Sequence, residues 1–237
     1  MVIKYKDASR VEYFEYDNLW DGNFDATKWT TASAGYTANA TWDVGGLRLY
    51  TNHGDSGEAG SVSAYTKIDL RSFGYRYVTF TGSTTSVAQA TGSGDHSQST
   101  VVIRLTSTNT GTNQNTLCSA YCQYLNVGAS GDGGVGAYSK AIFVIDLNYS
   151  STEIKVYRNG NVGDSSIGGT TSAATTVLIA DETVIDISAW TIVGIEITSA
   201  SSTTDSAGDT DSNGTGILGP IRFSNSLPGS MGRLNTP

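Results

Sequence analysis

The sequence is poor in charged residues and contains no run of basic ones. Of its 237 residues 15% are charged, with 14 Lys or Arg against 22 Asp or Glu, so the formal net charge is −8. Proteins that bind nucleic acid place patches of Lys and Arg against the phosphates, and anionic membranes attract polybasic segments. The sequence therefore predicts no nucleic-acid partner and no docking on an anionic membrane.

Long hydrophobic stretches are also missing. No apolar run approaches the ~18 residues of a membrane-spanning helix, and residues 1–17 lack the apolar region of a secretory signal peptide. Neither membrane insertion nor export by a leader of its own is therefore expected. The Ser-, Thr- and Gly-rich composition is nevertheless typical of extracellular proteins, so the expected location is a virion surface or the extracellular space.

The chain has two cysteines, Cys118 and Cys122. On one strand, Cα atoms four residues apart are separated by ~13 Å, whereas a disulfide requires less than ~7 Å. The two residues can pair only if the segment between them turns; otherwise they are small, semi-buried thiols. Too few further Cys or His residues lie near them for a zinc site.

Short segments of alternating character dominate the sequence. They are rich in Val, Ile, Thr, Tyr and Phe and are bounded by Gly, Asn, Asp or Ser, as half-buried β-strands are. No apolar pattern of helical period is evident, so at most turns or 3₁₀ pieces are expected, at 69–74 and 186–190. The pattern predicts an all-β, single-domain, two-sheet antiparallel β-sandwich of about eleven to thirteen strands, with little or no helix.

Polar, glycine-rich stretches separate these segments and are expected to be connections. An Asn159-Gly160 pair predicts a tight hairpin turn, because such a turn needs positive φ angles. The expected connections cover 51–61, 87–99, 106–116, 128–139 and 199–216.

The order of these segments resembles the concanavalin A-like (laminin-G-like) jelly roll of lectins and glucanases. The resemblance rests on "FEYDNLWDGNFDATKW", "GGLRLYT", "IKVYRNGN" and the closing pair "WTIVGIEITSA" and "GILGPIRFS". It implies a jelly-roll β-sandwich over residues 11–225. Residues 1–10 are then an N-terminal arm or docking strand, and 226–237 a C-terminal tail.

Glucanases of this fold carry a Glu-x-Asp-x-Glu strand that aims its acids into one cleft. Here Glu15 and Asp17 have that spacing, but the third position is Leu19, and Glu196 stands alone among apolar neighbours. Three further acids, Asp181, Glu182 and Asp186, show no alternation, and all of these acids are interpreted as surface charges or caps. Both histidines, His53 and His96, fall in stretches expected to be loops, and no G-x-S-x-G elbow occurs. The sequence thus predicts no catalytic residues and a protein that is not an enzyme.

One segment has the pattern of a calcium loop. Asp209, Asp211 and Asn213 alternate before Gly214, and the carbonyl of Thr215 is a further candidate ligand. The position that an EF-hand fills with Glu is Pro220, so a lone calcium loop is the prediction and calcium the expected cofactor. The alternative is a polar surface loop, in which Asp, Ser and Asn simply favour turns.

Aromatic side chains are the other candidate for a site. Trp29, Trp42 and Trp190 lie where core packing is expected, whereas Trp20 lies beside a turn and is the candidate for stacking on a glycan. The leading prediction is a non-catalytic structural or binding β-sandwich on a virion surface, as a capsid decoration, tail or fibre protein. Its expected partners are identical subunits or other virion proteins, with cell-surface glycans as a further candidate. The alternatives are a secreted carbohydrate-binding module or lectin, and a divergent glycoside hydrolase of the same fold.

Overall fold

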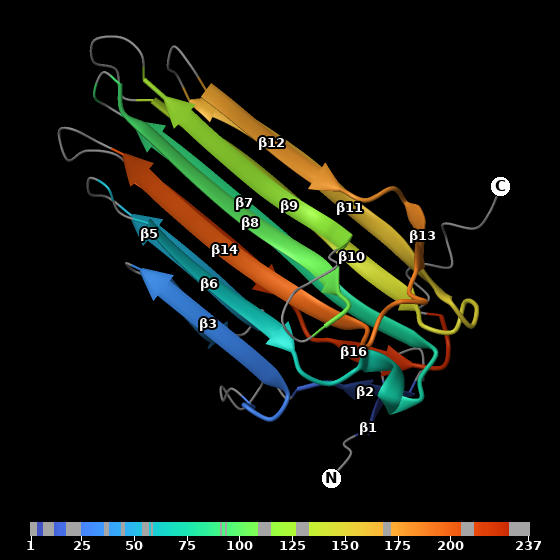
Figure 1. Ribbon diagram of the computed structural model, residues 1–237. Coiled ribbons are helices and arrows are strands. Elements are labelled where there is room, and N and C mark those ends of the chain that lie inside the picture. The colour runs from blue at the N-terminus through green and yellow to red at the C-terminus, as the bar shows by residue number, and fades with distance from the viewer. Residues whose placement is uncertain are drawn as a thin grey trace.

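Two stacked antiparallel β-sheets make up the protein (Figure 1). The computed structural model describes a set of ranges that cover most of the chain: 4–6, 12–17, 25–35, 38–43, 46–53, 57, 59–90, 92, 94–108, 115–126, 133–167, 172–204 and 211–227. Within them, the one described helix is the 3₁₀ turn η2 (Leu70–Phe73), which confirms the expectation for 69–74. None of the described helical residues forms a helix long and apolar enough to cross a bilayer.

The larger sheet has ten strands. Its main path runs β1 (Lys4–Lys6), β2 (Glu12–Glu15), β16 (Arg222–Ser224), β7 (Tyr77–Ala90), β10 (Gly133–Asp146), β11 (Glu153–Ile167) and β13 (Glu182–Asp186). Off this path, β15 (Asp211–Leu218) pairs with β7 and with β5 (Gly46–His53), and β5 also pairs with β4 (Ala38–Asp43). Strands from the two ends of the chain, β2 and β16, therefore lie side by side.

The second sheet has six strands. Its order is β12 (Ser172–Leu178), β9 (Asn115–Leu125), β8 (His96–Thr106), β14 (Gly194–Thr204), β6 (Ala59–Thr66) and β3 (Trp29–Gly35). Every strand pair in the described ranges is antiparallel. The jelly-roll β-sandwich is thus confirmed. The expected number of strands was too low, because the structure describes sixteen.

The strands extend into stretches that were expected to be connections. β7 continues to Ala90 and β8 already begins at His96, and β15 occupies 211–218, much of which lies in the expected 199–216 connection. These extensions are rich in Ser, Thr, Gly and Ala, which gives them the composition of loops. They pair regularly with neighbouring strands, so the backbone hydrogen bonds of the sheet decide the outcome.

The predicted hairpin at Asn159-Gly160 is wrong. β11 passes straight through this pair, and Gly160 lies opposite Ala141 of β10. A Cβ atom at Gly160 would lie 2.3 Å from the carbonyl oxygen of Lys140 and 2.4 Å from the Cβ of Ala141. Glycine is needed here for the close approach of two strands and not for a turn.

The sandwich is filled differently at its two ends. Near η2, a continuous core of buried Leu, Ile, Val, Phe, Tyr and Trp side chains lies between the sheets. At the other end, the buried cluster is made mostly of small residues, with one tyrosine: Ala88, Ala90, Ala120, Cys122, Tyr124, Val135 and Ala137. The apolar half supplies most of the hydrophobic stabilisation, because that term scales with the apolar area removed from water.

Buried hydroxyl groups form a polar seam between the sheets. We define it by the buried residues Thr51, Thr84, Ser86, Ser97, Ser99, Ser139, Ser199 and Ser212. Ser99 donates to the carbonyl of Asn213 at 2.8 Å, and the hydroxyls of Thr51 and Ser199 lie 2.9 Å apart. Cα atoms of β7 come within 8 Å of those of β8 and β9, closer than the ~10 Å usual for stacked sheets. Small side chains permit this approach, and their hydroxyls satisfy buried backbone carbonyls.

Both cysteines face the interior from β9. Cys118 and Cys122 are buried and form no disulfide, which decides between the two alternatives that the sequence left open. Cys122 donates from Sγ to the carbonyl oxygen of Ser86 across the sandwich at 2.8 Å. Burial raises the pKa of the Cys118 thiol to about 12, so this group stays protonated.

Part of the expected N-terminal docking arm belongs to the molecule's own sheet. Residues Lys4–Lys6 form β1, which pairs with β2 and places Tyr5 opposite Tyr13. Within the described ranges, β1 lies at one end of the main path of the ten-stranded sheet. The domain boundaries stay a prediction from the sequence.

Candidate functional site

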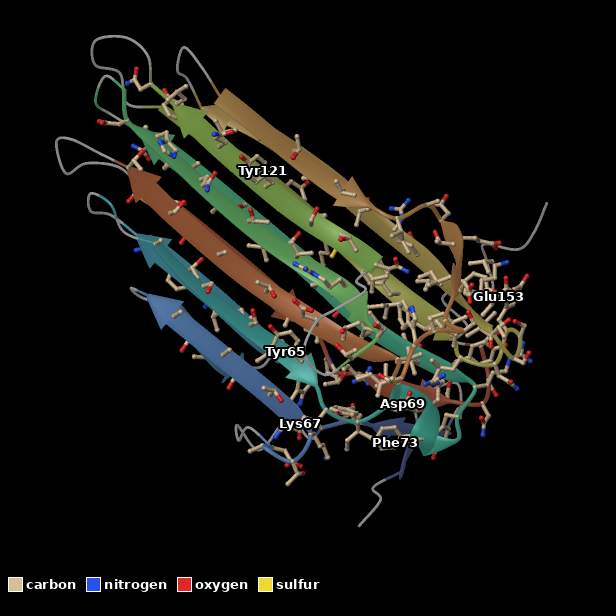
Figure 2. The ribbon with its side chains drawn as sticks, in the orientation of Figure 1. Tyr65, Lys67, Asp69, Phe73, Tyr121 and Glu153 are labelled. Carbon is tan, nitrogen blue, oxygen red and sulfur yellow. The ribbon has the colours of Figure 1, made fainter. Side chains whose placement is uncertain are left out.

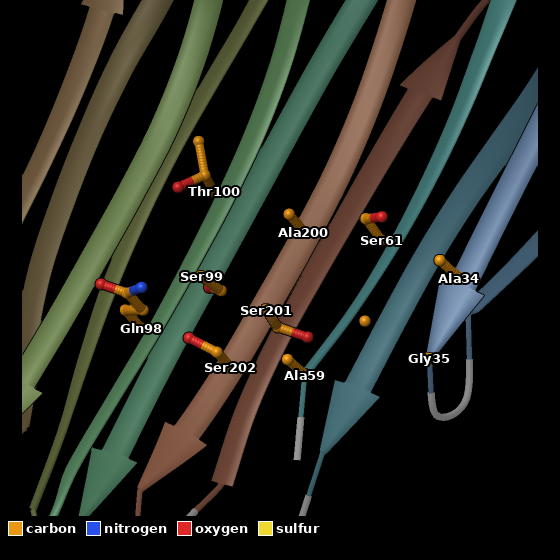
Figure 3. Close-up of a pocket in the computed structure, with 11 residues that line it drawn as sticks. Ala34, Gly35, Ala59, Ser61, Gln98, Ser99, Thr100, Ala200, Ser201 and Ser202 are labelled. Carbon is orange, nitrogen blue, oxygen red and sulfur yellow. The ribbon is translucent and has the colours of Figure 1, made fainter. Parts of the chain in front are cut away.

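The outer face of the six-stranded sheet carries an open hollow. Side chains alternate between interior and surface along each strand, and the surface positions here are mostly Ala, Ser and Thr. Where these small side chains adjoin, they leave a hollow of about 350 Å³ (Figure 3). We call it the sheet hollow; it is lined by Ala34, Gly35, Ala59, Gly60, Ser61, Gln98, Ser99, Thr100, Ala200, Ser201 and Ser202.

Neutral hydrogen-bonding groups line the sheet hollow, and further ones lie on the next strand, β9, outside its lining. The register places Gln98 of β8 beside Ser202 of β14 on one side and beside Gln123 of β9 on the other. Tyr121 donates from its hydroxyl to Oε1 of Gln123 at 2.9 Å, which orients that amide and leaves its NH₂ group as a donor. Tyr121 and Tyr65 both lie on this face of the sandwich (Figure 2). The arrangement is suited to a neutral, hydroxyl-rich ligand.

A carboxylate lies further along the same face. Glu196 of β14 is buried, and its Oε1 accepts a hydrogen bond of 2.9 Å from the Thr198 hydroxyl. Its other neighbour is Arg104, whose Nε is 3.7 Å from the same oxygen. Among the described strand residues that face outward from this sheet, Glu196 is the single carboxylic acid. A glycosidase needs two, at ~5–5.5 Å or ~6.5–9.5 Å from each other.

The two acids with glucanase-like spacing are structural. Glu15 is buried and accepts a hydrogen bond of 2.9 Å from Nε of Arg222, which joins β2 to β16. Asp17 is also buried and accepts from the indole of Trp29 at 2.9 Å. The interpretation of both, and of the buried Glu196, as surface charges or caps is therefore wrong, and neither Glu15 nor Asp17 borders the sheet hollow.

The other charged candidates have local roles. Asp181 pairs with Arg158, and Glu182 pairs with Lys155 at 2.6 Å. Asp186 accepts from the backbone N–H of Ser188 at 2.8 Å, and this bond lowers the pKa of its carboxyl. These contacts confirm the interpretation of these three acids as surface charges or caps.

The histidines lie in strands and not in loops. His96 is the first residue of β8, and its Nδ1 shares a hydrogen bond with the hydroxyl of Thr204. His53 is the last residue of β5. Each histidine is part of a strand pair: His96 lies opposite Thr204 of β14, and His53 lies opposite Ser212 of β15.

The predicted calcium ligands do not form a loop over the described part of the motif. Asp209 lies outside the described residues. Asp211, Asn213 and Thr215 occupy alternate positions of β15, between β5 and β7. In an extended strand the Cα atoms of Asp211 and Thr215 are ~13 Å apart, which is not the spacing of a turned loop, and the calcium site stays a prediction from the sequence. Within the described ranges, no three His, Cys, Asp or Glu side chains gather as metal ligands would.

The four tryptophans differ in how far the structure describes them. Trp29 is 3% exposed, which confirms its place in the core, and Trp190 is partly buried against the same core. Trp42 lies in β4, but its side chain is outside the described part. Trp20, the candidate for glycan stacking, falls outside the described residues, so its role stays a prediction.

The sequence did not single out the residues that border the sheet hollow. Gln98 and Ser202 lie in stretches expected to be connections, and Ser and Thr are too frequent to stand out. The available signal was period-2 alternation of Gln98, Thr100 and Val102 on one side of β8, with Ser99, Val101 and Ile103 on the other.

The fold and this face define an antiparallel jelly-roll β-sandwich with an open, neutral hollow on its smaller sheet. No protein-family model matches the sequence, and no curated protein does. Solved structures do match, and three of them are a carbohydrate recognition domain, a lectin and a carbohydrate-binding module.

The first is the carbohydrate recognition domain of Emp47p, at 11% identity over 86% of this chain and 100% of that one, with a TM-score of 0.31. The metal-free form of lectin I-B4 from Griffonia simplicifolia matches at 11% identity, over 91% and 99%, with a TM-score of 0.29. The CBM2 module of an evolved Dit from Lactobacillus casei BL23 phage J-1 matches at 12%, over 92% and 96%, with a TM-score of 0.35. At identities and TM-scores this low, the three matches are similarities and carry no conclusion about the function of this chain.

Proposed function

We propose that the protein is a non-catalytic carbohydrate-binding β-sandwich that holds a neutral glycan in the sheet hollow. One observation carries the proposal: amide and hydroxyl side chains border an open hollow of about 350 Å³ that is also lined by Ala and Gly. In binding sites of this size, a few polar groups fix the orientation of the ligand, and the remaining surface contacts it closely. Sugar hydroxyls both donate and accept, as do the hydroxyls and amides here.

The test is a glycan array followed by calorimetry on the best ligand. Replacing Gln98 by Ala removes a donor and an acceptor, so the affinity should fall about threefold to tenfold. Ala200→Trp fills the hollow from the surface side and should abolish binding. Gln89→Ala is the matched control, because Gln89 is also a half-buried strand glutamine but faces outward from the other sheet. Unchanged affinity in both hollow variants would refute the proposal.

The non-catalytic part has its own test. The described outer face offers Glu196 without a second acid, and hydrolysis of a glycosidic bond uses a pair. Incubation of the bound glycan with the protein should therefore yield no new reducing ends. Hydrolysis that disappears in Glu196→Gln would favour the glycoside hydrolase instead.

Calcium and Trp20 remain part of the proposal as predictions from the sequence. Asn213 and Thr215 lie further along the extended strand β15, so the acids to test are Asp211, at the start of that strand, and Asp209. Calcium should raise the melting temperature in the native protein and not in Asp211→Asn. Glycan addition should quench tryptophan fluorescence less in Trp20→Ala than in the native protein.

We place the carbohydrate-binding role ahead of the virion-surface role. The hollow is a feature that a binding module explains directly, whereas a virion role requires partners that the single chain does not include. Sizing and electron microscopy of the native material test the virion role, which predicts particles or filaments.

A further inference from the structure

A second hollow lies at the opposite end of the sandwich. We call it the end hollow; it measures about 370 Å³ and is lined by Arg71, Gly74, Tyr75, Arg76, Leu147, Asn148 and Asn225. These residues come from η2 and the segment after it, from the turn between β10 and β11, and from the segment after β16. Figure 1 shows η2 and that turn at one end, whereas the strand ends that line the sheet hollow lie at the other. The two hollows are separate sites.

Two guanidinium groups border the end hollow, and each is held by a carboxylate. Nε of Arg71 donates to both oxygens of Asp69 at 3.0 Å, and its Nη2 donates to the carbonyl of Thr191 at 3.1 Å. Nε and Nη2 of Arg76 donate to Asp146 at 3.1 and 2.8 Å. None of these bonds uses the Nη1 atoms. Bidentate pairing therefore fixes both planes and leaves a donor edge on each.

The acids are recessed and the bases are exposed. The side chain of Asp146 is 2% exposed and that of Arg76 is 49% exposed; for Asp69 and Arg71 the values are 24% and 33%. A ligand in the end hollow would meet the guanidinium edges first. The amides of Asn148 and Asn225 line the same space, and Oδ1 of Asn225 already accepts from the backbone N–H of Arg76 at 3.1 Å. This bond leaves the NH₂ group of Asn225 as a further donor.

The surface next to the end hollow carries aromatic rings and two cationic groups, of which Arg76 pairs with Asp146 and Lys155 with Glu182. The Arg76 guanidinium lies 5.0 Å from the ring centroid of Tyr77, and the Lys155 ammonium lies 5.0 Å from that of Tyr157. The register places Tyr77 and Lys155 on either side of Asp146. The net charge of −8 does not cancel this local arrangement, because interactions beyond the Debye length of ~8 Å are screened at physiological salt.

We propose that the end hollow binds the oxyanion of an acidic saccharide, a carboxylate or a sulfate ester. Two guanidinium edges and two amide groups converge on one space, and planar guanidinium groups match the geometry of such oxyanions. The volume leaves room for a sugar ring beside the anionic group. The saccharide part rests on the proposed function, whereas the oxyanion part stands on this geometry alone.

The test compares charged and neutral sugars on the full chain. Methyl glucuronide and galactose 6-sulfate should bind, with affinity that falls as salt rises, and methyl glucoside and galactose should bind at least about tenfold more weakly. Equal affinity for charged and neutral sugars would overturn the proposal. Inorganic sulfate is the separate arm: if it binds as tightly as galactose 6-sulfate, the saccharide part is wrong.

Variants locate the site. Asn148→Asp adds a negative charge to the end hollow and keeps the size of the side chain, so binding of the acidic sugars should weaken about tenfold. Asn159→Asp is the matched control, since Asn159 is exposed on β11 outside the hollow. Arg76→Gln should weaken binding too, provided its melting temperature shows a folded protein. If Asn148→Asp binds the acidic sugars as tightly as the control, the assignment to the end hollow is refuted. Gln98→Ala should leave the binding of acidic sugars unchanged, so this result can be told apart from a failure of the proposed glycan site in the sheet hollow.

Discussion

The indole Nε1 of Trp29 donates a hydrogen bond of 2.9 Å to Oδ2 of Asp17, and both side chains are buried. The Nζ atom of Lys28 lies 3.9 Å from the other carboxylate oxygen. The ring of Trp29 packs edge-on against Tyr16, with 5.4 Å between ring centroids. Asp17, which has the spacing of a glucanase acid relative to Glu15, is thus a hydrogen-bond acceptor that fixes the side chain of Trp29 in the core.

Asp17→Leu should therefore lower stability and not an activity. The substitution leaves a buried indole N–H without this acceptor, so the free energy of unfolding should fall by about 1–3 kcal/mol. Urea denaturation followed by fluorescence measures the change. Asp181→Leu, at an exposed ion pair, is the control and should stay within about 0.5 kcal/mol of the native protein. A smaller loss for Asp17 than for Asp181 would contradict this role.

Gly160→Ala should destabilise the protein more than Gly134→Ala does. An added methyl group at Gly160 meets the neighbouring strand at 2.3 Å, whereas at Gly134 the nearest atom is 3.7 Å away. Relief of such overlap requires backbone shifts, which cost about 1–3 kcal/mol. Both glycines lie in paired strands of the same sheet, so the pair is matched. Similar melting temperatures would favour a turn at Asn159-Gly160 over the continuous strand.

Asp69 should make stability depend on pH in the acid range. Burial acts to raise the pKa of its carboxyl, but hydrogen bonds from the Arg71 side chain and from the backbone N–H groups of Val193 and Arg71 outweigh it, so the pKa is lowered. A lowered pKa contributes stability above the unfolded value of about 3.9, and this contribution is lost as the pH falls through the folded value.

The comparison is with Asp69→Asn, measured by thermal denaturation from neutral pH to below pH ~4. The native protein should be more stable by about 1–2 kcal/mol at neutral pH, and the difference should shrink in acid. A difference that is constant with pH would show that the charge of Asp69 contributes nothing.

Both thiols should be unreactive in the folded protein. Cys118 and Cys122 are buried, and the raised pKa of Cys118 disfavours the thiolate that alkylating reagents attack. Iodoacetamide at mildly alkaline pH should modify neither residue until urea is added, when both should react. Reducing agent should not shift the melting temperature. Rapid labelling of the native protein, or a shift on reduction, would contradict the buried free thiols.

The apolar half of the sandwich could be predicted from the sequence, and the polar half could not. Alternation of Val78 and Phe80 with Tyr77 and Thr79 identifies β7, because Val78 and Phe80 are apolar and buried while their neighbours carry hydroxyl groups. Further along the same strand, Thr84 and Ser86 are buried while Ser83 and Thr85 face outward. Here the inward-facing and outward-facing residues are of the same types, so the sequence shows no alternation of apolar and polar residues from which the strand could be predicted.

The two hollows escaped prediction for related reasons. The sheet hollow lies where four strands place small side chains next to each other, and only the register brings Gln98 beside Ser202 and Gln123. The end hollow gathers Arg71, Asn148 and Asn225 from three distant segments. The site residues that the sequence did predict include Trp20 and Asp209, which lie outside the described residues.

The closeness of the sheets also limits how this chain can diverge. A methyl group at Gly214 would lie 2.7 Å from the Ser199 hydroxyl, and one at Gly216 would lie 2.8 Å from Val101. Size therefore restricts replacements in this half: Gly214 and Gly216 accept no side chain unless their neighbours shift, and other positions are expected to accept exchanges among Ala, Ser, Thr and Cys. Around the stacked rings of Phe80 and Phe143 polarity is a further restriction, and apolar residues of similar volume are the expected replacements. Distant relatives are thus expected to keep the order of the strands, while the polar half of their sequence varies among small residues. These are the residues that also make up loops, so the strands of this half are hard to recognise in a sequence.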